Sequence, residues 1–473
     1  MFLTPSIPAD LLIVMIVGLM VVHSVKLISA RRWLLFDPLN TFWAGIFIVY
    51  VIQPISFAKT LISWHHNGVF EETLLWIFIG LLCVVIGYEY DIGPIRARII
   101  PRCPDRLTPS RLAFSGYLLL GVGLVGYLFL FASAGGAANW LAVGRGGTDY
   151  ANINGYMALL TNYLPLGAVL LLFHASFHNV IKLKKTLIWS LGCLLWLWFV
   201  YLGTRSQTIM FTLMLLAAYY LPRRSRPPGW LLVGGFIFIF MLVSFQAQYR
   251  DKFTNLSFNL KSIDLEEAYR RTAPGFLGGD REIQTENVSR GIDFNCVMSV
   301  VELVPESVPY NYGYGHLEVF TRIVPRAVWP NKIYPGMEAV QGVLLRANLA
   351  DAYVRETALI MGPAFTFAGH WYYVGGPLGI IFGGLITGSL LRIIRNVYDR
   401  SVRSEGDIIL YSALIQIGFV EAAATPWGWI YTLPLTLLPL MVLFVLCKAR
   451  KKRKALILNP GRIICRSRTM GEQ

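Results

Sequence analysis

The sequence predicts an all-α polytopic integral membrane protein with about 11 transmembrane helices, and three observations support this fold class. Only 15% of the 473 residues are charged and 55% are hydrophobic, whereas an ordinary soluble domain has roughly 25% charged residues. The mean hydropathy of +0.55 is correspondingly high. The apolar residues also occur in long unbroken runs, and a run of about 20 is needed to cross the hydrocarbon core. Soluble, disordered and disulfide-scaffold classes are therefore excluded.

About eleven apolar runs qualify as candidate spans. They lie near residues 11–29, 39–57, 73–90, 112–133, 156–175, 186–203, 206–221, 229–247, 372–391, 408–424 and 428–447. No basic residue precedes the first run, and Lys26, Arg31 and Arg32 follow it. We therefore expect the first run to be a retained anchor and not a cleaved signal peptide.

Positive charge alternates along the chain, which is typical of a membrane protein with Lys and Arg on its cytoplasmic side. Every second connection between candidate spans is basic. These basic residues are Arg31 and Arg32; Arg96, Arg98, Arg102, Arg106 and Arg111; Lys182, Lys184 and Lys185; Arg223, Arg224 and Arg226; Arg392, Arg395, Arg400 and Arg403; and the tail from Lys448 to Lys454. The N-terminus is therefore predicted outside and the C-terminus inside. The net charge of +15 reflects this topology, and no nucleic-acid partner is expected.

The spans and connections predict four parts of the chain. Residues 1–247 form an N-terminal membrane bundle of about eight spans, and residues 372–447 form the C-terminal spans. Residues 448–473 form a basic inner tail. Residues 248–371 form an external segment that is too aromatic and apolar for a disordered linker, so we expect it to fold. Within it, the apolar run from Cys296 to Val304 predicts a short helix.

Cations at the outer ends of the spans predict a site for phosphate, because guanidinium pairs bidentately with phosphate oxygens and stays charged. Arg205 follows Gly203 and Thr204 in a very short external turn, and charge at membrane depth usually faces a polar cavity or a partner. Arg145 lies among glycines on another external loop, where the backbone can approach a ligand closely. The alternative for Arg205 is a helix-end arginine whose side chain reaches lipid phosphate. The alternative for Arg145 is that its loop is merely flexible.

A second group of cations lies in the external segment. Arg322, Arg326 and Lys332 occur in the string T-R-I-V-P-R-A-V-W-P-N-K-I-Y-P, where three prolines and a tryptophan restrict the backbone. Interfacial anchoring is the alternative role, and for Lys332 we favour it. For Arg326 we favour a binding role.

Two external histidines, His316 and His370, are candidate general bases, because an ordinary imidazole titrates near pH 6.5. A hydrogen-bonded structural role is the alternative for each. The sequence lacks P-loop, Rossmann, H-E-x-x-H, G-x-S-x-G and D-x-D patterns, and its nearest acidic pair is Asp264 and Glu266. We therefore expect no cofactor and no metal, and a metal-independent reaction on a lipid-linked substrate.

The string I-V-P-R-A-V-W-P-N-K, with A-G-H-W-Y-Y-V-G-G-P-L-G some way after it, resembles the O-antigen polymerase (Wzy-type) and oligosaccharide repeat-unit polymerase family of bacterial envelopes. The resemblance extends from about Arg145 to Gly379 and includes the Gly203-Thr204-Arg205 turn. It implies a GT-C-like glycosyltransferase in the bacterial inner membrane, with a periplasmic N-terminus and a cytoplasmic C-terminus. The family more usually has an acidic residue at the position of His370.

The resemblance also implies roles for individual residues. Arg205, Arg322 and Arg326 match the family's diphosphate-binding arginines, with Arg145 and Arg290 as weaker candidates. A sugar hydroxyl of one undecaprenyl-diphosphate-linked repeat unit would attack the anomeric carbon of the chain carried on another. Arginines would stabilise the departing diphosphate, and losing one such donor costs about 2.7–4 kcal/mol in comparable sites. His370, His316, or an acid such as Glu356 or Asp293 would accept the hydroxyl proton.

Other functions remain open from the sequence. An O-antigen ligase would use the same donor, and a lipid-linked glycan flippase would need charged residues along its spans, where this sequence has few. A scaffold subunit that docks through the basic tail is a further alternative, although such a tail also binds anionic lipid. The expected partners are the lipid-linked oligosaccharide, membrane lipid, and a flippase and chain-length regulator.

Overall fold

The computed structural model describes residues 8–29, 36–90, 103–133, 135–136, 160–201, 205–223, 225, 227–228, 230, 234–235, 293–317, 329, 365–400, 404–423 and 427–448. Within these residues the ordered structure is helical, apart from one antiparallel bridge between Leu107 and Lys448. Seven described helices are long and apolar enough to cross a membrane, and Tyr163–Phe177 and Leu437–Cys447 are shorter apolar helices. The predicted all-helical, polytopic membrane class is therefore confirmed. The count of about eleven spans and the GT-C-like arrangement stay predictions.

The described helices follow the predicted spans, except that the eighth range lies largely outside the described residues. They are α1 (Ala9–Ser29), α2 (Pro38–Phe47), the π-helix η1 (Ile48–Ile52), α3 (Gln53–Trp64), α4 (Val69–Glu89), α6 (Pro109–Ser133), α9 (Tyr163–Phe177), α10 (Lys182–Tyr201), α11 (Arg205–Arg223), α15 (Asp293–Leu303), the 3-10 helix η4 (Tyr314–Leu317), α19 (Thr366–Arg400), α20 (Glu405–Leu414), α21 (Gln416–Ala423) and α22 (Trp427–Cys447). The short helix predicted around Cys296 is confirmed as α15, and its external placement stays a prediction.

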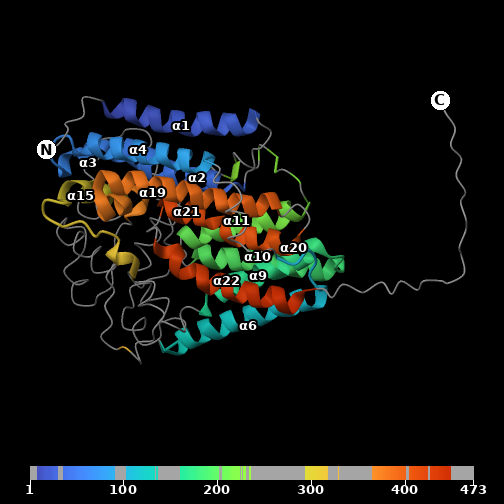
Figure 1. The fold of residues 1–473 in the computed structure, drawn as a ribbon. Helices are drawn as coiled ribbons and strands as arrows, with labels where there is room; N and C mark the ends of the chain where they lie inside the picture. The colour runs from blue at the N-terminus through green and yellow to red at the C-terminus, as the bar shows by residue number, and fades with distance from the viewer. Residues whose placement is uncertain are drawn as a thin grey trace, which may run out of the picture.

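The long helices lie side by side, so the bundle has two distinct ends (Figure 1). The α15 end, at the left, carries α3, α15 and the start of α19. The basic end, at the right, carries the C-terminal end of α22. We define the basic end by Lys26, Arg111, Lys182, Arg223 and Lys448, which lie at or next to helix termini there.

Helices α4 and α19 pack closely because glycines let their backbones touch. A Cβ atom at Gly384 would lie 2.6 Å from the carbonyl oxygen of Gly80, and one at Gly388 would collide with the carbonyl oxygen of Val84. Small residues at helix interfaces commonly allow such approach in membrane proteins. The pair forms a rigid support that runs from one end of the bundle to the other.

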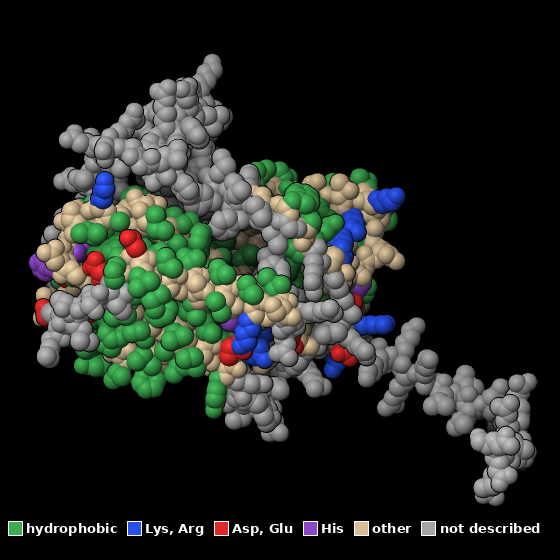
Figure 2. Space-filling model, turned by 90° about the horizontal axis from the view of Figure 1, so that it is seen from above, with side chains coloured by type: hydrophobic (Ala, Val, Ile, Leu, Met, Phe, Trp, Pro, Cys, Tyr) green, Lys and Arg blue, Asp and Glu red, His purple; other side chains and the backbone are tan. Residues whose placement is uncertain are grey.

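The described bundle has two main apolar cores. One gathers side chains of α1, α2, α4, α15 and the first part of α19, and the other those of α6, α9, α10, α11, α20 and α22. The outer faces are also apolar: Figure 2 shows a broad hydrophobic surface, with most of the visible Lys and Arg side chains on its right-hand half. Apolar side chains exposed along helices with this few charges are typical of a lipid-facing surface.

Candidate functional site

Helix α19 is broken near the α15 end into two parts that lie side by side. Its backbone is non-helical at Gly375 and Gly376, and Pro377 follows. Gly376 has a φ of 59°, a left-handed conformation that glycine adopts readily. Phe367, before the break, and Ile380, after it, both lie within 3.1 Å of the position that a Cβ atom at Gly80 would occupy. Residues 366–374 therefore form a short helix that packs back along the longer second part.

The break frees two backbone carbonyl groups, and a nearby turn satisfies them. The Tyr373 carbonyl would accept a hydrogen bond from residue 377 in a continuous helix, but proline has no N–H group. The N–H groups of Asn311 and Tyr312 donate instead to the carbonyls of Tyr373 and Val374, both at 2.9 Å. Because buried backbone groups must be paired, this turn and the break stabilise each other. The turn leads directly into η4, which carries His316.

The start of the short helix lies inside the protein and is capped by Tyr50. The hydroxyl of Tyr50 accepts a hydrogen bond from the N–H of Ala368 at 2.9 Å and shares another with the hydroxyl of Thr366 at 2.6 Å. Tyr50 belongs to the π-helix η1, and such bulges often occur at functional sites. Thr366 has a φ of 50°, which is unusual for a β-branched residue. Such strain costs about 1–3 kcal/mol and clusters at functional sites.

Two histidines and a tryptophan meet beside this short helix. The ring centroids of His316 and His370 lie 5.4 Å apart, and those of His370 and Trp371 lie 5.2 Å apart. The third pair, His316 and Trp371, is separated by 5.9 Å. His370 is 0% exposed, whereas His316 is partly exposed. The structure thus brings together both histidines predicted from the sequence, and His316 is the one that solvent can reach.

The surroundings of His316 keep its imidazole neutral. The Nδ1 atom lies 3.1 Å from the carbonyl oxygen of Gly313, and a carbonyl can only accept, so Nδ1 carries the hydrogen and Nε2 has the lone pair. Burial lowers the pKa of His316 to about 4, although the hydrogen bond to Gly313 opposes that shift. At neutral pH, Nε2 of His316 is therefore a hydrogen-bond acceptor beside Trp371.

Helix α15 supports this region through a polar clamp that is distinct from the histidine pair. The Nδ1 atom of His65 lies 2.5 Å from a carboxylate oxygen of Glu302, and its Nε2 atom lies 2.6 Å from the side-chain oxygen of Asn295. Glu302 also accepts from the backbone N–H of His66 at 3.1 Å. Next to this clamp, Val297 of α15 packs against Gly369. The clamp ties the connection between α3 and α4 to α15, and α15 to the short helix.

The remaining predicted site residues are mostly outside the described part of the chain. Arg205 is the first residue of α11, at the end of a helix as predicted, and its side chain is not among those described. The others that fall outside the described residues are Arg145, Arg290, Arg322, Arg326, Lys332 and Glu356. The proposed grouping of arginines around a diphosphate thus stays a prediction.

Sequence reasoning missed several polar residues of this region. Tyr50, Thr366, Asn295 and Glu302 lie in apolar or unremarkable stretches, and only the folded chain brings them together. The one available signal was the Gly375-Gly376-Pro377 run, which predicts a helix break. We instead expected the span to begin near residue 372, whereas α19 begins at Thr366, so His370 lies within a helix and not on a loop.

A different polar cluster lies near the basic end and ties helices together through charge. Arg395 pairs with Asp37 at 2.7 Å, and the Tyr88 hydroxyl contacts both carboxylate oxygens of Asp37 at 2.8 Å. Asp37 also caps α2 by accepting from the N–H of Leu39 at 3.0 Å. Because each group has a partner and Asp37 is 1% exposed, we interpret this cluster as structural.

Among the residues that the structure describes, no group of three or more His, Cys, Asp or Glu side chains is arranged to bind a metal ion. No protein-family model matches the chain, and no curated protein or solved structure matches it significantly. The assignment of function therefore depends on the site itself and on the motif resemblance.

Proposed function

We propose that this chain is a membrane-embedded glycosyltransferase that joins undecaprenyl-diphosphate-linked oligosaccharide units into a surface polysaccharide. The observation that carries the proposal is the neutral His316 beside His370 and Trp371, at the end of the bundle opposite the basic connections. The positive-inside pattern predicts that this end faces the periplasm, where the lipid-linked units are available after translocation.

The proposed reaction needs an acceptor for one proton and stabilisation for one leaving group. The hydroxyl oxygen of the acceptor sugar forms a bond with the anomeric carbon of the donor, and the bond from that carbon to the lipid diphosphate breaks. The hydroxyl proton passes to Nε2 of His316, and the negative charge of the departing diphosphate is stabilised by Arg205 and the arginines of the external segment. His370, the first choice of base from the sequence, becomes the second choice because its side chain is fully buried.

Aromatic side chains near His316 support binding of a sugar. Tyr312 is 80% exposed in the turn before η4, and its ring lies 5.9 Å from that of Tyr310. Tyr314 is also exposed. Exposed aromatic rings next to a buried polar group are typical of binding sites for partly apolar ligands such as sugars.

Extension of a purified lipid-linked repeat unit in nanodiscs tests the proposal. We expect the wild-type chain to produce oligomers, and His316→Ala to lower the rate about 10²- to 10⁴-fold, as is usual for loss of a general base. His178→Ala is the matched control, because His178 follows α9 at the other end of the bundle, and it should retain the wild-type rate. Wild-type protein that never extends the unit would refute the polymerase assignment, and equal rates for both variants would refute the role of His316.

Analysis of lipid-linked glycans in a deletion strain separates the polymerase from the ligase alternative. Single periplasmic repeat units should accumulate if the chain is a polymerase. Long lipid-linked chains would accumulate if it is a ligase, and units confined to the cytoplasmic leaflet would indicate a flippase.

A transporter of lipid-linked glycans is the second candidate, and two observations favour it. Glu421 is 2% exposed within the bundle and accepts a hydrogen bond from the hydroxyl of Thr387 at 3.0 Å. Helix α19 is broken, and both features occur along transport pathways. If the wild-type protein in liposomes moves the units to the other leaflet without extending them, and Glu421→Gln stops this movement, this candidate is favoured.

A further inference from the structure

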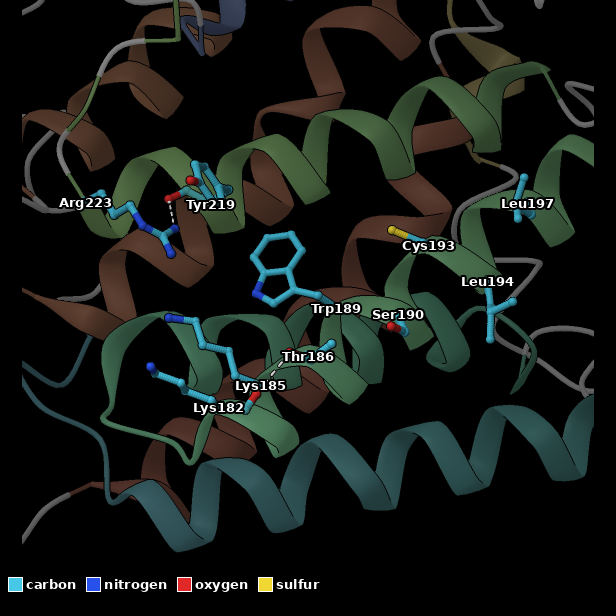
Figure 3. Close-up of a pocket in the computed structure, with 10 residues that line it drawn as sticks. All are labelled: Lys182, Lys185, Thr186, Trp189, Ser190, Cys193, Leu194, Leu197, Tyr219 and Arg223. Atoms are coloured by element: carbon cyan, nitrogen blue, oxygen red, sulfur yellow. Dashed lines mark hydrogen bonds between the residues drawn. The ribbon is translucent and has the colours of Figure 1, made fainter.

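A groove between α10 and α11 opens at the basic end and is unrelated to the histidine region. It has a volume of about 800 Å³. Figure 3 shows its lining ordered along its length: Lys182, Lys185 and Arg223 lie at one end, the Trp189 ring lies in the middle, and Leu194 and Leu197 lie at the other end. The groove is therefore polar and cationic at its mouth and apolar along its floor.

In the part of the chain that the structure describes, no carboxylate neutralises the cationic mouth. Among the described residues, Lys182, Lys185 and Arg223 form no ion pair with a carboxylate. Lys182 and Lys185 lie in the first turn of α10, which contains no acidic residue. A helix N-terminus carries partial positive charge, so lysines there are unfavourable unless an anion is present. The mouth is thus suited to an anionic group such as a phosphate.

Aromatic residues link the mouth to the apolar part of the groove. The guanidinium of Arg223 lies 3.8 Å from the ring centroid of Tyr219 and donates to the Tyr219 carbonyl at 2.6 Å, so its position is fixed. The edge of the Trp189 ring packs against Tyr219, with centroids 5.6 Å apart. Trp and Tyr prefer the interface between lipid head groups and acyl chains. The Trp189 and Tyr219 pair therefore lies at the depth where the head group of a bound lipid would end and its acyl chain would begin.

The apolar end of the groove is open to the surrounding membrane. Leu194 is 62% exposed and Leu197 is 53% exposed, on a helix that crosses the bundle at its periphery. Leucines exposed at this depth of a spanning helix contact lipid chains or another protein. A molecule with an anionic head and an apolar tail matches the whole lining.

We propose that the groove binds an anionic glycerophospholipid, with its phosphate at Lys182, Lys185 and Arg223 and an acyl chain along Trp189, Leu194 and Leu197. Anionic glycerophospholipids are the phosphate-bearing amphiphiles of a cytoplasmic leaflet, and basic pockets between helices recognise their head groups. The bound lipid neutralises the lysines at the start of α10 and joins α10 to α11. The site is separate from the proposed reaction and does not depend on it.

Native mass spectrometry of the purified chain, titrated with phosphatidylglycerol or with phosphatidylcholine of the same acyl chains, tests the site. The test variant is Lys182→Gln with Lys185→Gln. The matched control is Lys184→Gln with Arg106→Gln, because Lys184 lies in the same turn but lines a different hollow beside His178. Arg106 is exposed at the same end of the bundle. Both variants lose two positive charges, and their thermal unfolding midpoints establish that both fold.

We expect the wild-type chain to bind phosphatidylglycerol in preference to phosphatidylcholine. The test variant should bind phosphatidylglycerol roughly thirtyfold more weakly, since each cation near anionic lipid contributes about a factor of five, and the control should change less than about twofold. Phosphatidylglycerol with brominated chains should also quench wild-type fluorescence more than that of Trp189→Phe.

Four results would overturn the proposal. Equal loss of binding in both variants would show that lipid binding depends only on the general surface charge. Equal binding of the two lipids would show that the groove accepts any amphiphile. Tighter binding of a polyprenyl diphosphate than of phosphatidylglycerol would assign the groove to the glycan carrier. A dimer whose formation excludes the lipid would assign it to a second copy of the chain.

Discussion

The two ends of the bundle use polar side chains in opposite ways. At the basic end, the buried acid Asp37 is matched with Arg395, and Glu89 bonds to Lys26 and His23 at 3.0 and 3.2 Å. At the α15 end, His316 and Tyr50 form hydrogen bonds to backbone groups around a broken helix. Charge fixes the helices at the basic end. Around the broken helix at the α15 end, apart from the Glu302 clamp on α15, the hydrogen bonds join neutral donors and acceptors beside a strained backbone. Functional sites commonly retain such strain, which is why we propose the α15 end as the place of the proposed reaction.

The largest effect on stability is expected from Asp37→Ala. The substitution leaves the buried guanidinium of Arg395 without its carboxylate, which costs about 3–5 kcal/mol, and it removes the cap of α2, which costs about 1 kcal/mol more. The free energy of unfolding in mixed micelles measures this loss. Asp399→Asn is the control, because Asp399 also contacts Arg395, at 3.2 Å, but is half-exposed, and it should cost less than about 1 kcal/mol. Similar losses in the two variants would contradict a structural role for the buried pair.

A smaller effect is expected from Gly388→Ala, which forces α4 and α19 apart at their closest approach. The added methyl group meets the Val84 carbonyl, and such overpacking costs about 1–3 kcal/mol. At Gly121 of α6, a Cβ atom would meet nothing within 4 Å, so Gly121→Ala should leave stability unchanged or raise it by up to about 1 kcal/mol. Thermal unfolding of the two variants compares them directly. A stable Gly388→Ala protein would show that this contact is not rigid.

Tyr50→Phe is expected to act locally at the α15 end. Loss of the hydroxyl leaves the Ala368 N–H unsatisfied inside the protein, at a cost of about 1–3 kcal/mol. Hydrogen exchange should therefore speed up in residues 366–374 before it does in the second part of α19. Tyr117→Phe is the control, because Tyr117 is exposed, and it should change neither the stability nor the hydrogen exchange of α19. Uniform acceleration along all of α19 would contradict the view that its first part is a separately capped helix.

The sequence was sufficient to predict the helical membrane class, because long unbroken apolar runs are visible in the order of the residues. It also singled out His316 and His370 as candidate bases, but it did not predict that the two rings lie 5.4 Å apart. It did not predict the short helix that starts inside the bundle, since its cap comes from Tyr50, which is 316 residues away in the chain from Thr366. The Asp37 and Arg395 pair, 358 residues apart, was missed for the same reason. Such contacts depend on how helices are arranged, which periodicity does not reveal.

The smallest effect is expected from pH, and its sign follows from His316. Burial lowers the pKa of this imidazole from 6.5 to about 4, so the folded chain binds fewer protons than the unfolded chain between those values. The contribution of His316 to stability is therefore complete above about pH 6.5 and is lost as the pH falls toward 4. Activity should vary less than about twofold between pH 6 and 8 on account of this group. An acid limb centred near pH 6.5 that disappears in His316→Gln would contradict the neutral assignment.

Photocrosslinking of a polyprenyl diphosphate that carries a diazirine next to its head group tests most directly whether the α15 end binds the substrate of the proposed reaction. Peptides that contain residues 310–317 and the start of α11 at Arg205 should be labelled, and unlabelled lipid-linked glycan should compete. Labelling concentrated instead between Lys182 and Leu197, with none near His316, would contradict the assignment of the reaction to the α15 end.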